Sequence, residues 1–349
     1  MTRKPDFKRL ETALWCKEPD FVPLVELGIA KSIKENYLGL PVNSLQDEID
    51  FSVKAGYDFI KLQPIIDMNP GKIQPRSERL TTKTAEGADR VWASEHEGII
   101  TSWEDFNRYL WPRKEDISYE RFDKIRPLLP EGMKVIGQYG DIFTMAWGMM
   151  GFENFSMALY MEPELVKALF NKIGELLLSM YENMVTFDCV GALWYSDDIA
   201  YASGLLISPE ALRAYFFPWL KKIGAIAKKY HLPFLYHSDG VLWDVFDDII
   251  DSGVNAIHPI EPKAMDIKEV KKKYQGKLCV IGNIDLGYTL TRGTPEETAL
   301  EVKEKIKALA PGGGYCLGSS NSIPEYVKPE NFRAMVETTK QFGKYPISV

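Results

Sequence analysis

The sequence predicts an α/β fold of the (β/α)8 TIM-barrel type, with an N-terminal extension and an insertion after the second strand. From residue 134 onward, short apolar runs rich in β-branched and aromatic residues alternate with amphipathic helical segments, as in repeated βα units. Counting back to residue 21 gives eight such units, which close most simply as a barrel. An open doubly wound sheet is the alternative. No glycine-rich dinucleotide motif follows any predicted strand, which weakens that alternative.

The elements follow from these runs in chain order. The predicted strands cover residues 21–28, 57–64, 134–140, 190–196, 233–238, 254–260, 278–284 and 314–318. Helices are expected over most of 31–56, after Glu164, after Ser208 and Pro209, through Trp243 and Ile250, over 295–309 and over 329–342. Thr294 with Glu297 forms a capping box, and Ser208 before Pro209 is a typical helix start. Residues 66–130 interrupt this rhythm, so we expect one domain over 1–349 with 66–130 as an insertion covering the barrel mouth.

The composition limits the classes of partner. A formal net charge of −7 argues against nucleic acid and against an anionic membrane surface. The chain has no uncharged apolar window of about 18 residues, and its first residues lack the apolar core of a signal peptide. The four cysteines have no CxxC spacing, which suits a reducing compartment. We therefore expect a cytoplasmic protein.

Polar residues collect where the predicted strands end, which is where barrel enzymes carry their chemistry. His237 and Asp239 leave the strand 233–238 two residues apart, so strand alternation points them the same way. Cys316 ends the last strand and is a third candidate ligand. An excess of carboxylates at these strand ends favours a divalent cation. Imidazole, carboxylate and thiolate together fit zinc.

Each of these residues also has a structural interpretation. His237 can be a core histidine, Asp239 a helix cap, and Cys316 a small buried apolar residue. Asp197 and Asp198 can bind substrate or orient a ligand, but they can equally be loop carboxylates. Glu26 leaves the first predicted strand and is a candidate catalytic residue or further metal ligand, although a lone glutamate carries little information.

Several segments resemble the uroporphyrinogen decarboxylase superfamily. They are WYSDDIA, GLLISPE, FLYHSDG, IHPIEP, VIGNIDLG, GTPEE, and GGGYCLGSSNSI followed by PENFRAMVE. The resemblance covers roughly residues 130–345 well and the first 130 weakly. It implies a (β/α)8 barrel and one of two chemistries, because the superfamily also includes corrinoid-dependent methyltransferases.

The resemblance favours the methyltransferase branch. The decarboxylases carry an arginine-rich N-terminal segment, where this chain has VELGIAKS at 25–32. Gly148 stands about where they have a catalytic tyrosine, and Ser319 where they have a histidine. The chain is similar to methylcobalamin:coenzyme M methyltransferases, which bind zinc through a His-x-Cys motif and a distant cysteine. His237 and Cys316 match that pattern, and Asp239 replaces the nearer cysteine.

A carboxylate in place of a thiolate makes a harder zinc site, better suited to an oxygen than to a thiol. The resemblance therefore implies an O-demethylating methyltransferase. It would move a methyl group between a small methylated substrate, expected to be methoxylated, and a corrinoid carried on a partner protein. Asp197 and Asp198 would contact substrate. A decarboxylase of uroporphyrinogen decarboxylase type and a non-catalytic binding relative are the alternatives, and the sequence leaves open a homodimer.

Overall fold

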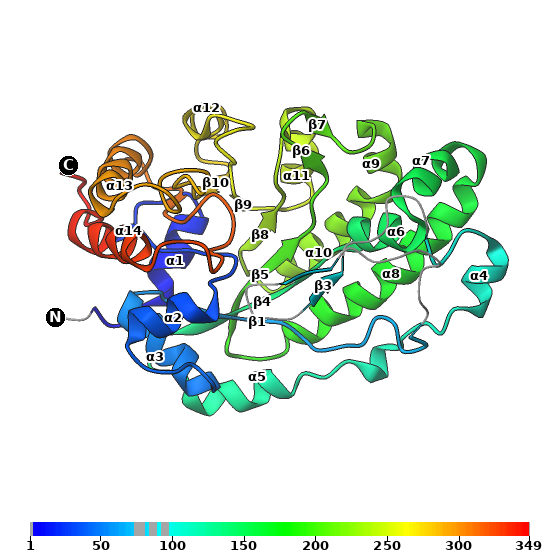
Figure 1. Ribbon diagram of the computed structural model, residues 1–349, viewed down its shortest axis with the longest axis horizontal. Coiled ribbons are helices and arrows are strands. Elements are labelled where there is room, and N and C mark those ends of the chain that lie inside the picture. Colours follow the sequence, from blue (N-terminus) through cyan, green and yellow to red (C-terminus); the bar gives the residue numbers. More distant parts are fainter. Residues whose placement is uncertain (1–2, 73–80, 84–88, 92–97, 349) are drawn as a thin grey trace.

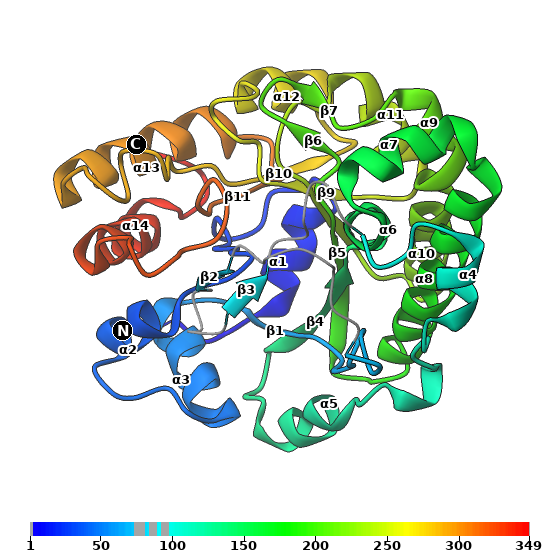
Figure 2. The ribbon, with the colours of Figure 1, turned by 45° about the vertical axis from the view of Figure 1, so that its right-hand side comes forward.

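Seven parallel strands form the central sheet of the computed structural model, in the order β1-β4-β5-β8-β9-β10-β11 (Figure 1). The structure describes residues 3–72, 81–83, 89–91 and 98–348. The strands of this sheet are β1 (Phe59–Leu62), β4 (Lys134–Gly140), β5 (Val190–Ser196), β8 (Phe234–His237), β9 (Ala256–His258), β10 (Cys279–Ile281) and β11 (Tyr315–Cys316). The predicted fold class is confirmed: the sheet is curled and surrounded by helices, as in a TIM barrel (Figure 2).

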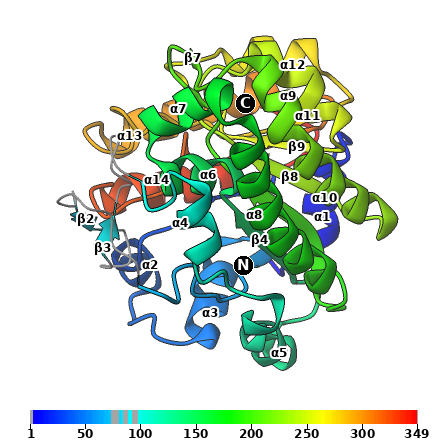
Figure 3. The same ribbon diagram turned by 90° about the vertical axis from the view of Figure 1, so that its right-hand side faces the viewer.

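Helices connect the strands and cover the outside of the sheet. They are α1 (Phe7–Leu14), α2 (Lys31–Leu38), α3 (Leu45–Ala55), α4 (Trp103–Arg108), α5 (Glu120–Ile125), α6 (Ile142–Met150), α7 (Phe152–Met161), α8 (Pro163–Met184), α9 (Pro209–Tyr215), α10 (Phe217–Lys229), α11 (Phe246–Asp251), α12 (Ile267–Lys273), α13 (Pro295–Leu309) and α14 (Pro329–Phe342). Short 3-10 turns occupy η1 (Lys114–Asp116), η2 (Arg126–Leu128) and η3 (Trp243–Val245). Figure 3 shows α8 and α10 side by side against the sheet.

Local sequence signals explain where several helices begin. The Thr294 side chain accepts a hydrogen bond from the Glu297 backbone N–H, and the Glu297 side chain accepts one from the Thr294 backbone N–H, which confirms the predicted capping box of α13. Ser208 caps α9 immediately before Pro209, also as predicted. The strands β5 and β8 are almost wholly buried, as expected for a parallel sheet covered by helices.

The first predicted strand, residues 21–28, differs from expectation. It makes an isolated parallel bridge from Leu24 to Leu317, and Ile29 makes another to Ile323. Pro23 has no backbone N–H, so it cannot donate the next hydrogen bond that would extend this parallel pairing toward the N-terminus. Among the described residues no strand pairing links this segment to β1. The barrel therefore has a seam, defined here as the gap between residues 24–29 and β1.

The N-terminal extension closes the end of the barrel at which the strands begin. The helix α1 packs against β5 and β11 and lies near the middle of the ring of helices in Figure 2. Phe7 lies against Gly191, so close that a Cβ on that glycine would sit 2.5 Å from the Phe7 ring. Because Gly191 is near the start of β5, α1 covers the amino ends of the strands. The carboxyl ends of the strands lie at the other end of the barrel, which is its mouth.

Two short antiparallel pairs stand outside the main sheet, β2 (Thr81–Lys83) with β3 (Asp89–Val91) and β6 (Ala200–Tyr201) with β7 (Gly204–Leu205). The first pair falls within the predicted insertion at 66–130. Residues 73–80, 84–88 and 92–97 of that insertion lie outside the described residues, and its role as a cover for the mouth stays a prediction. No helix in the described part of the chain has both the length and the apolar character needed to cross a bilayer.

Candidate metal centre

Three side chains meet at the carboxyl ends of β5 and β8. Asp198 follows β5, His237 is the last residue of β8, and Asp239 comes two residues later. One ligand atom from each lies within 4.8 Å of the others. His237 is buried, Asp239 is half-buried and Asp198 is exposed. Two carboxylates and an imidazole at this spacing can hold a divalent cation, and their nitrogen and oxygen donors suit zinc. We refer to these three residues as the Asp-His-Asp cluster.

A second histidine sets the orientation of His237. The Nδ1 atoms of His237 and His258 lie 2.8 Å apart, because β8 and β9 pair with these two residues in register. The Nε2 atom of His237 faces Asp198 Oδ1 at 3.5 Å. For Nε2 to offer its lone pair to a cation, Nδ1 must carry the proton and donate it to His258. Burial lowers the pKa of His237 and lowers that of His258 well below its usual value, so both rings are neutral at pH 7.

The electrostatics of Asp239 favour a nearby positive charge. Burial, followed by the charges of Asp198 and Glu261, raises the pKa of Asp239 to about 8. Asn321 Nδ2 donates to Asp239 Oδ2 at 2.6 Å, whereas the buried Oδ1 has no hydrogen-bond partner among the described residues. An unsatisfied buried oxygen beside other carboxylates is costly unless it is protonated or bound to a cation. Asp239 therefore has one oxygen positioned by Asn321 and the other available to a metal.

Asp197 and Asp198 are adjacent in sequence but contact different parts of the structure. Asp197 is buried and accepts from the backbone N–H groups of Phe143 and Thr144 at 2.6 and 3.0 Å, at the start of α6. It also accepts from Thr144 Oγ1 and from the hydroxyl of Tyr195. These bonds anchor the N-terminus of α6. Asp198 instead accepts from Asp239 N and faces His237, so only Asp198 belongs to the cluster.

Glu26 and Cys316 lie outside the Asp-His-Asp cluster. Glu26 accepts from Ser319 N at 2.7 Å and from Ser319 Oγ at 2.6 Å, and burial raises its pKa to about 8. The Cys316 sulfur is buried and lies 3.9 Å from Cys279 Sγ. Its role as a ligand stays a prediction.

The fold brings inward two polar residues that the sequence did not assign to the site. The position of His258 before Pro259 favours a structural role over a catalytic one, yet His258 contacts His237 directly. Lys61 lies in β1, and its ammonium is 5.9 Å from the Trp194 ring and lowers the pKa of His237. Strand alternation offers a signal for Lys61, because it lies on the same side of the chain as Gln63, which follows β1 at the end of the strand.

The comparisons with known proteins place the chain in a family. The family model described as uroporphyrinogen decarboxylase (URO-D) matches residues 93–342, more than half of the chain. A uroporphyrinogen decarboxylase of Chlorobium phaeobacteroides is 26% identical over 81% of this chain and 83% of that protein. One of Anaeromyxobacter dehalogenans is 25% identical over 66% of this chain, and the match spans only 65% of that protein.

A solved structure supports the same fold. The structure of a methyltransferase from Methanosarcina mazei superposes with a TM-score of 0.70 at 17% identity, over 97% of this chain and 99% of that one. At this identity the likeness establishes the fold. Together with the match to the family model, it means that the chain belongs to the uroporphyrinogen decarboxylase (URO-D) family.

Proposed function

We propose that the chain is a zinc-dependent methyltransferase that moves a methyl group between a small methylated substrate, expected to be methoxylated, and a corrinoid on a partner protein. The observation that carries this proposal is the Asp-His-Asp cluster at the strand ends, with ligand atoms within 4.8 Å and one buried Asp239 oxygen without a partner. The fold of the Methanosarcina methyltransferase agrees with it. Uroporphyrinogen decarboxylation alone gives no reason for a histidine between two carboxylates.

His237 Nε2 and Asp239 Oδ1 are the proposed first ligands, with Asp198 as a third and Cys316 as the predicted thiolate. Bound zinc supplies Lewis acidity to a substrate oxygen, and the corrinoid, held by another protein, supplies the methyl carrier. The chain's own contribution is positioning. His258 orients the His237 ring, and Asn321 holds Asp239 through its other oxygen.

Asp198 is the candidate substrate contact because its side chain is 49% exposed while its Oδ1 remains tied to the cluster. Its exposed surface faces the mouth, where substrate and partner protein would both arrive. Asp197, which anchors α6, would act on substrate only indirectly. Glu26 would act from outside the cluster, as a protonated carboxyl group near neutral pH.

A carboxy-lyase is the second candidate, because the matched curated relatives are uroporphyrinogen decarboxylases. A polycarboxylate substrate requires several basic groups in one pocket. The pocket near β1 is lined by three basic side chains, Lys34, Lys61 and a single arginine, Arg121. That set is small for a substrate with many carboxylates. The third candidate is a non-catalytic relative, which would have neither activity.

The proposal is tested by metal analysis and an anaerobic assay on the same preparation. Purified protein is incubated with reduced cobalamin and a panel of methoxylated and methylated-amine compounds, and formation of methylcobalamin is followed by its absorbance. We expect about one zinc per chain and transfer from at least one methoxylated compound. His237→Ala should lose both, with transfer falling by roughly 10²–10³-fold, since a bound metal contributes several kcal/mol.

Asp247→Asn is the matched control because it removes an exposed carboxylate on α11, away from the cluster. It should retain zinc and activity. Decarboxylation of uroporphyrinogen by the metal-free protein would overturn the proposal in favour of the second candidate. If the protein has neither activity and binds no zinc, the third candidate, a non-catalytic binding relative, would be favoured. The cytoplasmic location, the corrinoid protein and a homodimer remain predictions.

A further inference from the structure

A series of close polar contacts joins Glu26 to the Asp-His-Asp cluster. Ser319 N and Oγ lie 2.7 and 2.6 Å from the two carboxyl oxygens of Glu26, and the same Oγ lies 2.8 Å from the backbone carbonyl oxygen of Asn321. The side chain of Asn321 then donates from Nδ2 to Asp239 Oδ2 at 2.6 Å. We refer to Glu26, Ser319, Asn321 and Asp239 as the Glu26–Asp239 link.

Two further contacts fix the middle of this link. Ser319 makes an isolated parallel bridge with Ile284, which holds its backbone beside the segment that follows β10. The backbone N–H of Ser322 donates to Asn321 Oδ1 at 2.7 Å. Because Oδ1 is occupied by this bond, the amide nitrogen of Asn321 is the group that faces Asp239. Both ends of the Asn321 residue are therefore held in place.

The Ser319 hydroxyl shows which form of Glu26 completes the link. This hydroxyl has a single hydrogen but two oxygens within reach, Glu26 Oε2 and the carbonyl oxygen of Asn321. If Glu26 is ionised, the hydroxyl can donate fully to only one of them. If Glu26 is protonated, Glu26 donates to Ser319 Oγ, Ser319 donates to Asn321, and both contacts are hydrogen bonds. Burial raises the pKa of Glu26 to about 8, so the protonated form predominates at pH 7.

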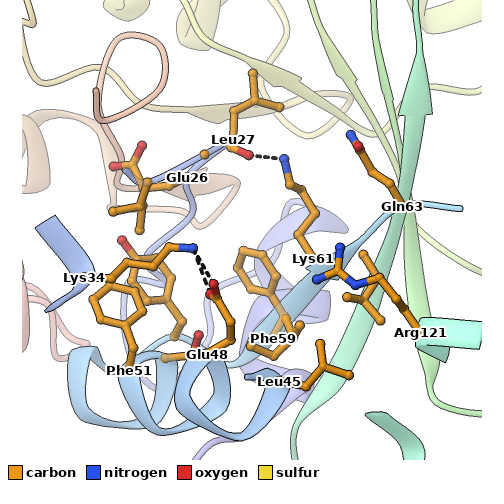
Figure 4. A pocket seen from close by; sticks show the side chains of 16 residues that line it. Glu26, Leu27, Lys34, Leu45, Glu48, Phe51, Phe59, Lys61, Gln63 and Arg121 are labelled. Atoms are coloured by element: carbon orange, nitrogen blue, oxygen red, sulfur yellow. Dashed lines mark hydrogen bonds and ion pairs between the residues drawn. The ribbon is translucent and has the colours of Figure 1, made fainter. Parts of the chain in front are cut away.

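The surroundings of Glu26 agree with this neutral form. Its side chain is only 4% exposed. Figure 4 shows its carboxyl group apart from the ion pair between Lys34 and Glu48, and apart from Lys61, which donates to the Leu27 carbonyl oxygen. The carboxyl group is thus engaged through hydrogen bonds with the 319–321 segment rather than through an ion pair.

We propose that Glu26 is a positioning residue for the metal centre, which acts through Ser319 and Asn321 on Asp239. Glu26 directs the Ser319 hydroxyl to the Asn321 carbonyl, Asn321 holds Asp239 Oδ2, and Oδ1 is left for the cation. The link passes through Asn321 from its backbone carbonyl to its side-chain amide, so it transmits position rather than a proton. This role rests on the proposed function, in which Asp239 is a zinc ligand.

The zinc affinity of variants along the link, measured at pH 7 by competition with a fluorescent chelator, tests this role. Glu26→Met keeps the length of the side chain but cannot make the hydrogen bonds, and Ser319→Ala removes the hydroxyl. Each should weaken zinc binding by ~10-fold, as for residues that orient a ligand. Glu26→Gln should keep the wild-type affinity, because its amide nitrogen can donate to Ser319 Oγ and its amide oxygen can accept from Ser319 N.

Ser320→Ala is the matched control. Ser320 is buried and adjacent to Ser319, but its hydroxyl accepts from the backbone N–H of Leu286 at 3.1 Å and takes no part in the link. This substitution should leave zinc affinity unchanged. Circular dichroism establishes that each variant is folded, and Ser319→Ala tests the link without altering the buried carboxyl group.

A double-mutant cycle in the absence of metal separates this inference from the proposed function. Urea unfolding in the presence of EDTA compares Glu26→Met, Asp239→Ala and the double variant. Residues in one hydrogen-bond network are not additive, so Glu26→Met should lower the free energy of unfolding less in the Asp239→Ala background than in wild type. Wild-type protein that binds no zinc would contradict the proposed function, and the cycle would still decide the inference. Additive losses in the cycle, or equal zinc affinities of Glu26→Met and Glu26→Gln, would overturn the inference.

Discussion

The strand ends at β8 and β9 and the seam beside β1 are two parts of the same barrel with opposite constructions. At β8 and β9 the ladder is continuous, and the register sets His237 directly beside His258. The Asp-His-Asp cluster lies beside this pair, at the carboxyl ends of β5 and β8. At the seam no ladder is present among the described residues, and a single side chain, Lys61, spans the gap to Leu27. Continuous pairing brings polar groups together, whereas its interruption leaves a pocket.

The two regions also raise carboxyl pKa values for different reasons. Asp239 and Glu26 both reach about 8. Asp239 is raised by burial and by the negative charges of Asp198 and Glu261, which a bound cation would offset. Glu26 is raised by burial alone, while hydrogen bonds from Ser319 lower it. Metal should therefore change the protonation of Asp239 and leave Glu26 protonated near neutral pH.

The largest expected effect concerns Glu26. Its pKa is higher in the folded protein, about 8, than its ordinary value of 4.5, so the folded state holds a proton that the unfolded state has lost between those two pH values. Wild-type stability should therefore fall as pH rises from about 4.5 to 8. Glu26→Gln removes this dependence and should be more stable than wild type by on the order of 2–3 kcal/mol at pH 7.

Urea unfolding of both proteins at pH 5, 7 and 8.5 measures this. The advantage of Glu26→Gln should grow from pH 5 to 7 and level off above pH 8. A constant difference at all three values would contradict the assignment of Glu26 as a buried, protonated carboxyl group.

A substitution at His258 tests the region of continuous strand pairing at β8 and β9. Replacing it with phenylalanine removes the acceptor for His237 Nδ1, so zinc affinity should fall ~10–100-fold, as for other residues that orient a ligand histidine. His258→Asn places an amide oxygen near the former Nδ1 position and should restore most of the affinity. Competition with a fluorescent zinc chelator gives the affinities. Equal affinities for wild type and His258→Phe would mean that His237 does not depend on this contact.

The smallest expected effect lies on the seam side. Glu48→Gln breaks the partly exposed ion pair with Lys34 and should cost only ~0.5 kcal/mol of stability. The difference should shrink in 0.5 M salt, where the Debye length is only a few ångströms. Thermal unfolding at low and high salt measures it. A loss larger than that from a buried core substitution would show that the pair, rather than Lys61, holds the seam together.

Local sequence signals predicted much of this architecture. The alternation of apolar runs and amphipathic segments identified the βα units, and capping residues located the starts of α9 and α13. Strand alternation also placed His237 and Asp239 on one side, where the structure brings them together with Asp198. These features depend on neighbours in sequence, which explains why they could be read directly.

Contacts between distant segments could not be predicted in the same way. The pairing of residues 21–28 depends on which strands lie beside it, so the seam was not foreseen. The contact between Cys316 and Cys279, and that between His258 and His237, depend on the register of adjacent strands. Asp197 looked equivalent to Asp198 because only the fold shows which one meets the N-terminus of α6.

The most direct test of the metal centre is the zinc content of Asp239→Asn after exhaustive dialysis against a weak chelator. Asparagine has nearly the same shape as aspartate, and its amide oxygen can still accept from Asn321 Nδ2, so the substitution mainly removes the negative charge. The account predicts about one zinc per wild-type chain and a clear loss in Asp239→Asn, with the fold intact by circular dichroism. Equal zinc content and unchanged methyl transfer in Asp239→Asn would contradict it, because Asp239 would then act only through its hydrogen bond with Asn321.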